Sequence, residues 1–173
     1  MKTRILTTTI LATLVLSSTV AYAAEFETIK NPTAGLSIDL PTGWRSVPLP
    51  TGLIASAAER DDLGRPEVSF NIGQPDLGGK SFAALREEQR AGAERRSKQG
   101  DLLTLIELEH AAGPAFRLTR RTTTSDGLVQ VVHAVYVAAG STIWLLNWIV
   151  PPSNAPDRLD ELFLMVTASF RVE

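Results

Sequence analysis

The second half of the chain contains four stretches in which apolar residues alternate with polar ones or run together. A period of two is typical of strands, whereas the apolar positions of a helix recur about every 3.6 residues. The joints between these stretches are short and contain Gly, and such joints produce antiparallel hairpins rather than crossovers. The pattern therefore predicts an antiparallel meander of four strands over residues 102–110, 115–124, 128–138 and 142–150.

The first half predicts shorter strands and one helix, and a second helix follows the meander. Residues 81–98 are rich in Ala, Glu, Arg and Gln, and Ser81 can cap this helix by accepting a hydrogen bond from a free backbone N–H. Leu159, Leu162 and Phe163 recur at helical spacing within 155–167, so we expect that helix to lie on the sheet. The other predicted strands are residues 35–40, 44–47, 53–59, 67–72 and 169–172.

The joints of the meander determine which side chains we expect to face each other. If residues 126–127 and 140–141 are two-residue hairpin loops, the register of both strand pairs follows. That register places Arg120, His133 and Trp148 in one row across the apolar face. If this row forms a ligand-binding cleft, Arg120 would bind an anionic group of the ligand and Trp148 would pack against the apolar part of the ligand. If the row has only a structural role, His133 is a hydrogen-bonded core histidine and Arg120 reaches solvent at the sheet edge.

The first 24 residues have the three parts of a secretory signal peptide. Lys2 and Arg4 precede an apolar run diluted by Thr and Ser, and small residues surround a cleavage site at Ala23 and Ala24. We expect removal of residues 1–23 to leave a mature chain, 24–173, that forms one domain and is periplasmic or secreted. No cysteine follows the apolar run to carry a lipid, so we expect no membrane anchor after cleavage.

Composition narrows the classes of function further. Hydrophobic residues make up 44% of the chain and charged residues 21%, as in soluble globular proteins. Without residues 1–23 the chain has 15 basic and 19 acidic side chains, a net charge of −4. A mildly acidic chain has no electrostatic basis for binding nucleic acid. The chain contains no cysteine, which excludes disulfides and thiol nucleophiles.

No motif predicts catalytic residues, a cofactor or a metal site. Glu107 and Glu109 fall on one face of their strand and His110 on the other, so a solvated strand end is favoured over a metal site there. The Gly-Gly-Lys-Ser run at 78–81 ends like a phosphate-binding loop. Gln74 stands where that motif requires its first glycine, so we interpret the run as a flexible entry to the helix.

Two segments resemble the PsbP-like and DcrB-like proteins. The stretch 35–44, Gly-Leu-Ser-Ile-Asp-Leu-Pro-Thr-Gly-Trp, resembles their opening strand followed by Pro, x, Gly and Trp, and 163–171 resembles their closing helix followed by Ser-Phe-Arg. The resemblance implies an α+β fold, a single antiparallel β-sheet flanked by helices in an α/β/α sandwich. It gives Gly43 a role in a turn and places Trp44 and Phe170 in the core. The group has no shared catalytic motif, and its members mostly bind or assist larger partners.

We therefore expect an exported, non-catalytic binding or accessory protein of the bacterial cell envelope that acts through protein–protein contacts. One alternative is a small-ligand carrier that uses a cleft near Arg120, His133 and Trp148. A second alternative is a hydrolase whose carboxylate or Ser/His site has no recognisable motif. The expected partner is an envelope protein, and the sequence does not identify it.

Overall fold

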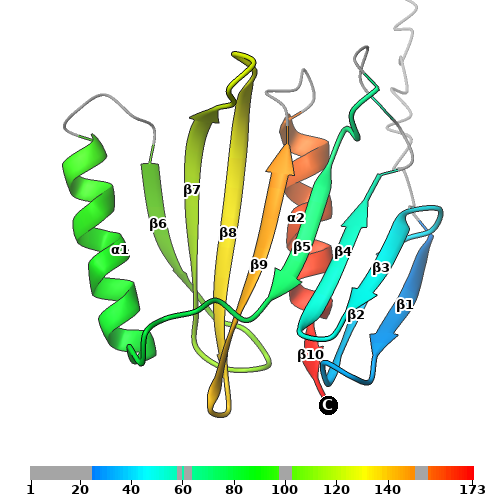
Figure 1. Cartoon of the computed structure of the whole chain (residues 1–173), viewed down its shortest axis with the longest axis horizontal. Helices are drawn as coiled ribbons and strands as arrows, with labels where there is room; N and C mark the ends of the chain where they lie inside the picture. Colours follow the sequence, from blue (N-terminus) through cyan, green and yellow to red (C-terminus); the bar gives the residue numbers. More distant parts are fainter. Residues whose placement is uncertain (1–24, 58–59, 61–63, 98–102, 151–155) are drawn as a thin grey trace, which may run out of the picture.

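The computed structural model describes residues 25–57, 60, 64–97, 103–150 and 156–173. Over these ranges the chain forms ten strands and two α-helices (Figure 1). Each predicted strand and helix corresponds to one of them. The strand β1 was not predicted, because it is mostly exposed and lacks a clear apolar alternation. The elements are β1 Phe26–Asn31, β2 Leu36–Pro41, β3 Arg45–Leu49, β4 Gly52–Ser56, β5 Ser69–Gly73, α1 Phe82–Ser97, β6 Leu103–Leu108, β7 Ala115–Thr123, β8 Val129–Ala139, β9 Thr142–Val150, α2 Pro156–Ser169 and β10 Arg171–Val172.

The strands form two antiparallel sheets, so the expectation of a single sheet is wrong. Within the described residues, one sheet has the order β1-β2-β10 and the other has the order β3-β4-β5-β9-β8-β7-β6. β2 cannot pair with β3, because β1 occupies one of its edges and β10 occupies the other. Between β2 and β3 the chain turns at Gly43, whose φ of 89° is one that other residues rarely adopt.

The main core lies between α2 and both sheets. Phe163 and Phe170 of the α2 region pack edge-to-face on Trp148 and Trp144 of β9, with ring centroids 5.6 and 5.8 Å apart. Leu36, Ile38 and Leu40 of β2 close the same core and are at most 1% exposed. The apolar stripe predicted for the second helix therefore packs as expected, and Phe170 lies in the core.

Helix α1 lies on the opposite face of the seven-stranded sheet and covers only part of it. Its N-terminus is capped as predicted, since the Ala84 backbone N–H donates to Ser81 Oγ at 3.2 Å. Ala93 packs against Leu118 of β7 and Ala134 of β8. The polar side of α1 is held by Arg90, whose guanidinium lies 2.7 Å from the Glu107 carboxylate of β6.

One of the two predicted hairpin registers is correct and the other is off by one residue. β8 and β9 pair as expected, with His133 opposite Trp148. β7 and β8 are joined by a three-residue loop, because Thr124 already pairs with Leu128 through a 2.8 Å backbone hydrogen bond. A shift of one residue moves every side chain of a strand to the other face. Arg120 therefore lies opposite Val132 rather than His133.

The predicted signal peptide, with its cleavage site at Ala23 and Ala24, lies outside the described residues. Across the part of the chain that the structure describes, no helix is both long and apolar enough to cross a membrane.

Candidate functional site

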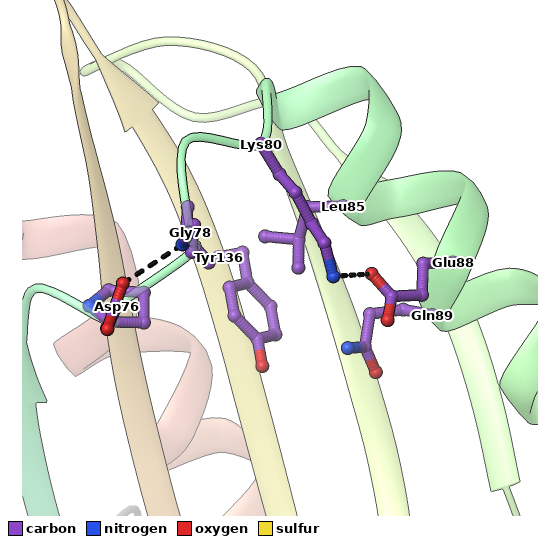
Figure 2. A pocket seen from close by; sticks show the side chains of 9 residues that line it. Asp76, Gly78, Lys80, Leu85, Glu88, Gln89 and Tyr136 are labelled. Carbon is purple, nitrogen blue, oxygen red and sulfur yellow. Dashed lines mark hydrogen bonds and ion pairs between the residues drawn. The ribbon is translucent and has the colours of Figure 1, made fainter.

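A hollow opens on the side of the seven-stranded sheet that carries α1. Its volume is about 410 Å³. One wall is the segment that leads from β5 into α1, a second wall is the first turns of α1, and the floor is Tyr136 of β8 (Figure 2). The predicted flexible entry to the helix is therefore part of a binding-sized depression, which no sequence pattern indicates.

Aromatic packing fixes the floor of the hollow. The ring of Tyr136 stacks on Phe116 of β7 with centroids 4.8 Å apart, and Phe82 of α1 lies 5.4 Å from Phe116 on centroids. Leu85, which also lines the hollow, is only 4% exposed. Burial raises the pKa of the Tyr136 phenol, while the nearby positive charge of Arg120 partly opposes this rise. The phenol is therefore neutral at physiological pH and available for hydrogen bonds.

Polar groups from both walls surround this floor. Lys80 Nζ lies 2.6 Å from the Glu88 carboxylate across the mouth of the hollow (Figure 2). Asp76 lies on the other side of Tyr136 and accepts a 2.9 Å hydrogen bond from the Gly78 backbone N–H. The side chain of Gln89 lines the same space as Tyr136. The hollow thus combines an apolar floor with hydrogen-bonding groups at its rim.

The same face of the sheet continues beyond α1 as an uncovered surface, which we call the open face. Strand register places Val47, Ile54, Asn71 and Asn147 side by side on β3, β4, β5 and β9. Asn147 lies opposite Ala134, which packs against Ala93 of α1, so this row is on the side of the sheet that carries α1. Val47 is 57% exposed and Ile54 is 49% exposed. Large apolar side chains that are exposed together are typical of interaction surfaces.

The three residues predicted to form a ligand cleft do not come together. His133 and Trp148 are direct neighbours, but Trp148 is 1% exposed and belongs to the core. Arg120 points to the opposite face of the sheet, because the three-residue loop shifts the register of β7. Thr119 lies opposite His133 instead, and its Oγ1 is 3.1 Å from His133 Nδ1. Ligand binding by any one of the three residues stays a prediction.

His133 lies in a half-buried cluster with Arg117 and Phe163. The His133 ring lies 5.1 Å from the Phe163 ring, and the Arg117 guanidinium lies 5.4 Å from the centroid of that ring. Burial lowers the pKa of His133, Arg117 lowers it further, and Asp160 acts in the opposite direction. This arrangement favours the neutral imidazole of a structural histidine.

Two of the three side chains considered for a metal site, Glu107 and His110, have structural partners. His110 Nε2 lies 2.9 Å from the Thr167 carbonyl oxygen, and His110 Nδ1 accepts a 3.0 Å hydrogen bond from Ala112. The Glu107 carboxylate lies 2.7 Å from Arg90 and 3.5 Å from Arg86. These contacts attach β6 and the loop after it to the two helices.

The sequence matches no protein-family model and no curated protein. Solved structures do match the fold. Cyanobacterial PsbP (CyanoP) from Synechocystis superposes with a TM-score of 0.55 at 17% identity, over 92% of this chain and 99% of that one. The fold of this chain is PsbP-like.

Two further structures have the PsbP-like fold of this chain. The Saccharomyces cerevisiae Ran-binding protein Mog1p has a TM-score of 0.53 at 11% identity, over 87% of this chain and 96% of its own. PA94, a protein of unknown function from Pseudomonas aeruginosa, has a TM-score of 0.51 at 17% identity, over 80% and 92%. At such identities the likeness concerns the fold alone. The DcrB-like part of the sequence resemblance stays a prediction.

Proposed function

We propose that this chain is an exported, non-catalytic accessory protein of the bacterial cell envelope that binds a larger protein partner. The predicted signal peptide supports the location, and the PsbP-like fold supports an accessory role, since it occurs in CyanoP and in the Ran-binding protein Mog1p. The binding surface in this proposal is the open face, together with the hollow beside it.

The observation that carries the proposal is the exposure of Val47 and Ile54 beside two asparagines. On the other side of the sheet, α2 buries the apolar face. On this side, the buried residues of α1 are Leu85 and Ala93, so the helix covers only its own end of the sheet. A surface with apolar centres and neighbouring amides suits a protein partner, because burial of the apolar side chains supplies affinity and the amides form hydrogen bonds.

The small-ligand carrier stays a weaker alternative, because the row that defined its cleft is not formed. The hydrolase alternative has no arrangement of side chains in its favour among the described residues.

The test is site-specific photo-crosslinking in the cells that export the protein. A photoreactive amino acid at Ile54 samples the open face, and the same amino acid at Leu164 is the matched control. Leu164 is 53% exposed and lies on α2, on the far side of the sheet. We expect one dominant protein adduct from position 54 and none from 164. Equal adducts at both positions, or none at either, would refute the proposal.

A further inference from the structure

Two glycines interrupt the side chains of the open face. Gly52 of β4 lies directly opposite Gly73 of β5, and this pair has Leu49 of β3 on one side and Leu145 of β9 on the other. Ile54 follows Gly52 by two positions, so it lies on the same face in the next row. The open face therefore has a gap between apolar side chains, at Gly52 and Gly73, which we call the glycine gap.

The two glycines have different structural reasons. A Cβ on Gly52 would lie 2.0 Å from the Ile72 carbonyl oxygen, so the close approach of β4 to β5 requires glycine there. Gly73 has a φ outside the left-handed region, and no heavy atom beyond its chain neighbours lies within 4 Å of the place of a Cβ. Glycine weakens a strand, and it often marks a site where another group approaches the backbone closely. We therefore interpret Gly73 as space for a group from outside the chain.

The charges near the glycine gap favour an uncharged occupant. On the open face, the strands β3, β4, β5 and β9 carry one charged side chain, Arg45, which lies two rows away from the gap. In the neighbouring hollow, Lys80 pairs with Glu88. The positive charge of Arg120, which acts on the floor of the hollow, balances the carboxylate of Asp76. A charged side chain in the gap would lose water without gaining an opposite charge, whereas an apolar side chain is stabilised by the same burial.

We propose that the glycine gap receives one large apolar side chain, a leucine, a methionine or an aromatic residue, from the protein partner. This side chain lies over Gly73, and Leu49 and Leu145 contact its two sides. The amide of Asn71, two positions before Gly73 on the same face, forms a hydrogen bond with the backbone of the partner segment. This inference rests on the proposed accessory function, and it adds the kind of residue that the partner presents and the place where it binds.

The first experiment fills the gap from within the chain. Gly73→Leu is combined with the photoreactive amino acid at Ile54 in the exporting cells, and Gly92→Leu is the matched control. Gly92 also has no heavy atom within 4 Å of the place of a Cβ, but it lies on α1. We expect Gly73→Leu to reduce the adduct by roughly tenfold or more, as for loss of a central interface contact, and Gly92→Leu to leave it unchanged. Equal adducts from the two variants would overturn the proposal.

A folding control accompanies these variants. Thermal melts of a chain that starts at residue 24 compare Gly73→Leu with the unchanged protein. We expect no loss of stability, because a Cβ at this position meets open space. If Gly73→Leu lowers Tm, Gly73→Ala takes its place, and it should reduce the adduct by about two- to fivefold because a methyl group fills only part of the gap. An adduct that Gly73→Ala leaves unchanged would then refute the inference.

The second experiment needs no partner. The ¹⁵N-labelled protein is titrated with N-acetyl-leucinamide in nuclear magnetic resonance, and N-acetyl-glutaminamide is the uncharged polar control. We expect the leucine probe to shift the signals of the Gly73 backbone amide and the Asn71 side-chain amide, with a dissociation constant on the order of ten millimolar. Gly73→Leu should abolish the shift of the Asn71 signal. Equal shifts from both probes, or no shift from the leucine probe, would show that the gap does not select an apolar side chain.

Failure of this inference is distinguishable from failure of the proposed function. If Ile54 crosslinks to a partner and Gly73→Leu leaves that adduct intact, the accessory function stands and the glycine gap is refuted as the binding point. If the leucine probe binds at the gap but Ile54 gives no adduct, the gap accepts an apolar side chain and the accessory function is refuted. If Gly73→Leu weakens the adduct and Gly92→Leu does not, both are supported.

Discussion

Asn31 connects the two sheets, and its removal should destabilise the protein severely. Its side chain belongs to β1 and is 3% exposed. Nδ2 donates to the carbonyl oxygens of Leu49, at 2.8 Å, and of Gly52, the two residues that flank the β3–β4 turn. Oδ1 accepts a hydrogen bond of 3.2 Å from the Ala34 backbone N–H. One side chain thus orders the turn of one sheet against the end of a strand in the other.

The size of the loss follows from these three hydrogen bonds. Each contributes a net of about 1 kcal/mol, and a buried acceptor that stays unpaired costs a further 1–3 kcal/mol or so. Water can reach the β3–β4 turn once the amide is removed, so we expect Asn31→Ala to lower the free energy of unfolding by about 3 kcal/mol. In a domain of about 150 residues this corresponds to roughly 6–12 °C in Tm. Denaturant unfolding of a chain that starts at residue 24, with calorimetry, measures both quantities.

Two variants make this expectation refutable. Asn71→Ala removes a half-buried asparagine from the open face and should cost less than about 1 kcal/mol. Asn31→Asp keeps the acceptor but places a carboxylate oxygen against two carbonyl oxygens, so it should be at least as harmful as Asn31→Ala. If Asn31→Ala and Asn71→Ala have equal effects, the link between the sheets does not carry the stability assigned to it.

Two further predictions concern backbone sterics and pH. Gly113→Ala should prevent stable folding, because the φ of Gly113 is 142° and the new Cβ would lie 2.0 Å from the Ala138 carbonyl oxygen. Gly92→Ala, at an open position inside α1, should stabilise the protein by about 0.5–1 kcal/mol. Thermal melts that rank the two variants equally would contradict this prediction. Burial lowers the pKa of His133 in the folded state below its ordinary value of 6.5. As pH falls below about 6.5, the histidine of the unfolded state is therefore protonated first, and the free energy of unfolding decreases. This decrease ends once pH is below the lowered pKa of the folded state. His133→Gln should lack this loss in unfolding measured at pH 7.5 and pH 5, and Arg117→Gln should raise the pKa of His133 in a nuclear magnetic resonance titration; an unchanged pKa would refute the role of Arg117.

The unequal helices explain why one face of the sheet is available for binding. Phe163 and Val166 of α2 are at most 2% exposed and fill the core. α1 presents polar side chains on most of its surface, and its buried residues are Leu85 and Ala93. A helix with so little apolar surface can cover only a small part of a seven-stranded sheet. The open face and the hollow are therefore consequences of the composition of α1.

Local sequence determined the helices, every strand except β1, and one hairpin register. Alternation predicts β7, β8 and β9 because each strand meets a core on one face. Gly140 and Ser141 form the assumed two-residue loop, which sets the register of β8 and β9. The Ser81 cap is likewise an interaction between residues three apart. Such features need no knowledge of distant parts of the chain.

Only the tertiary structure decided the register of β7, the division of the strands into two sheets, and the hollow. The sequence between β7 and β8 is compatible with a loop of two or of three residues. The length of this loop determines whether Arg120 or Thr119 lies opposite His133. β10 occupies an edge of β2 although the two strands stand at opposite ends of the chain, and this pairing divides the strands into two sheets. The hollow joins Tyr136 of β8 to the entry of α1. Contacts between distant residues leave no local periodic signal, so the pattern of apolar and polar positions does not reveal them.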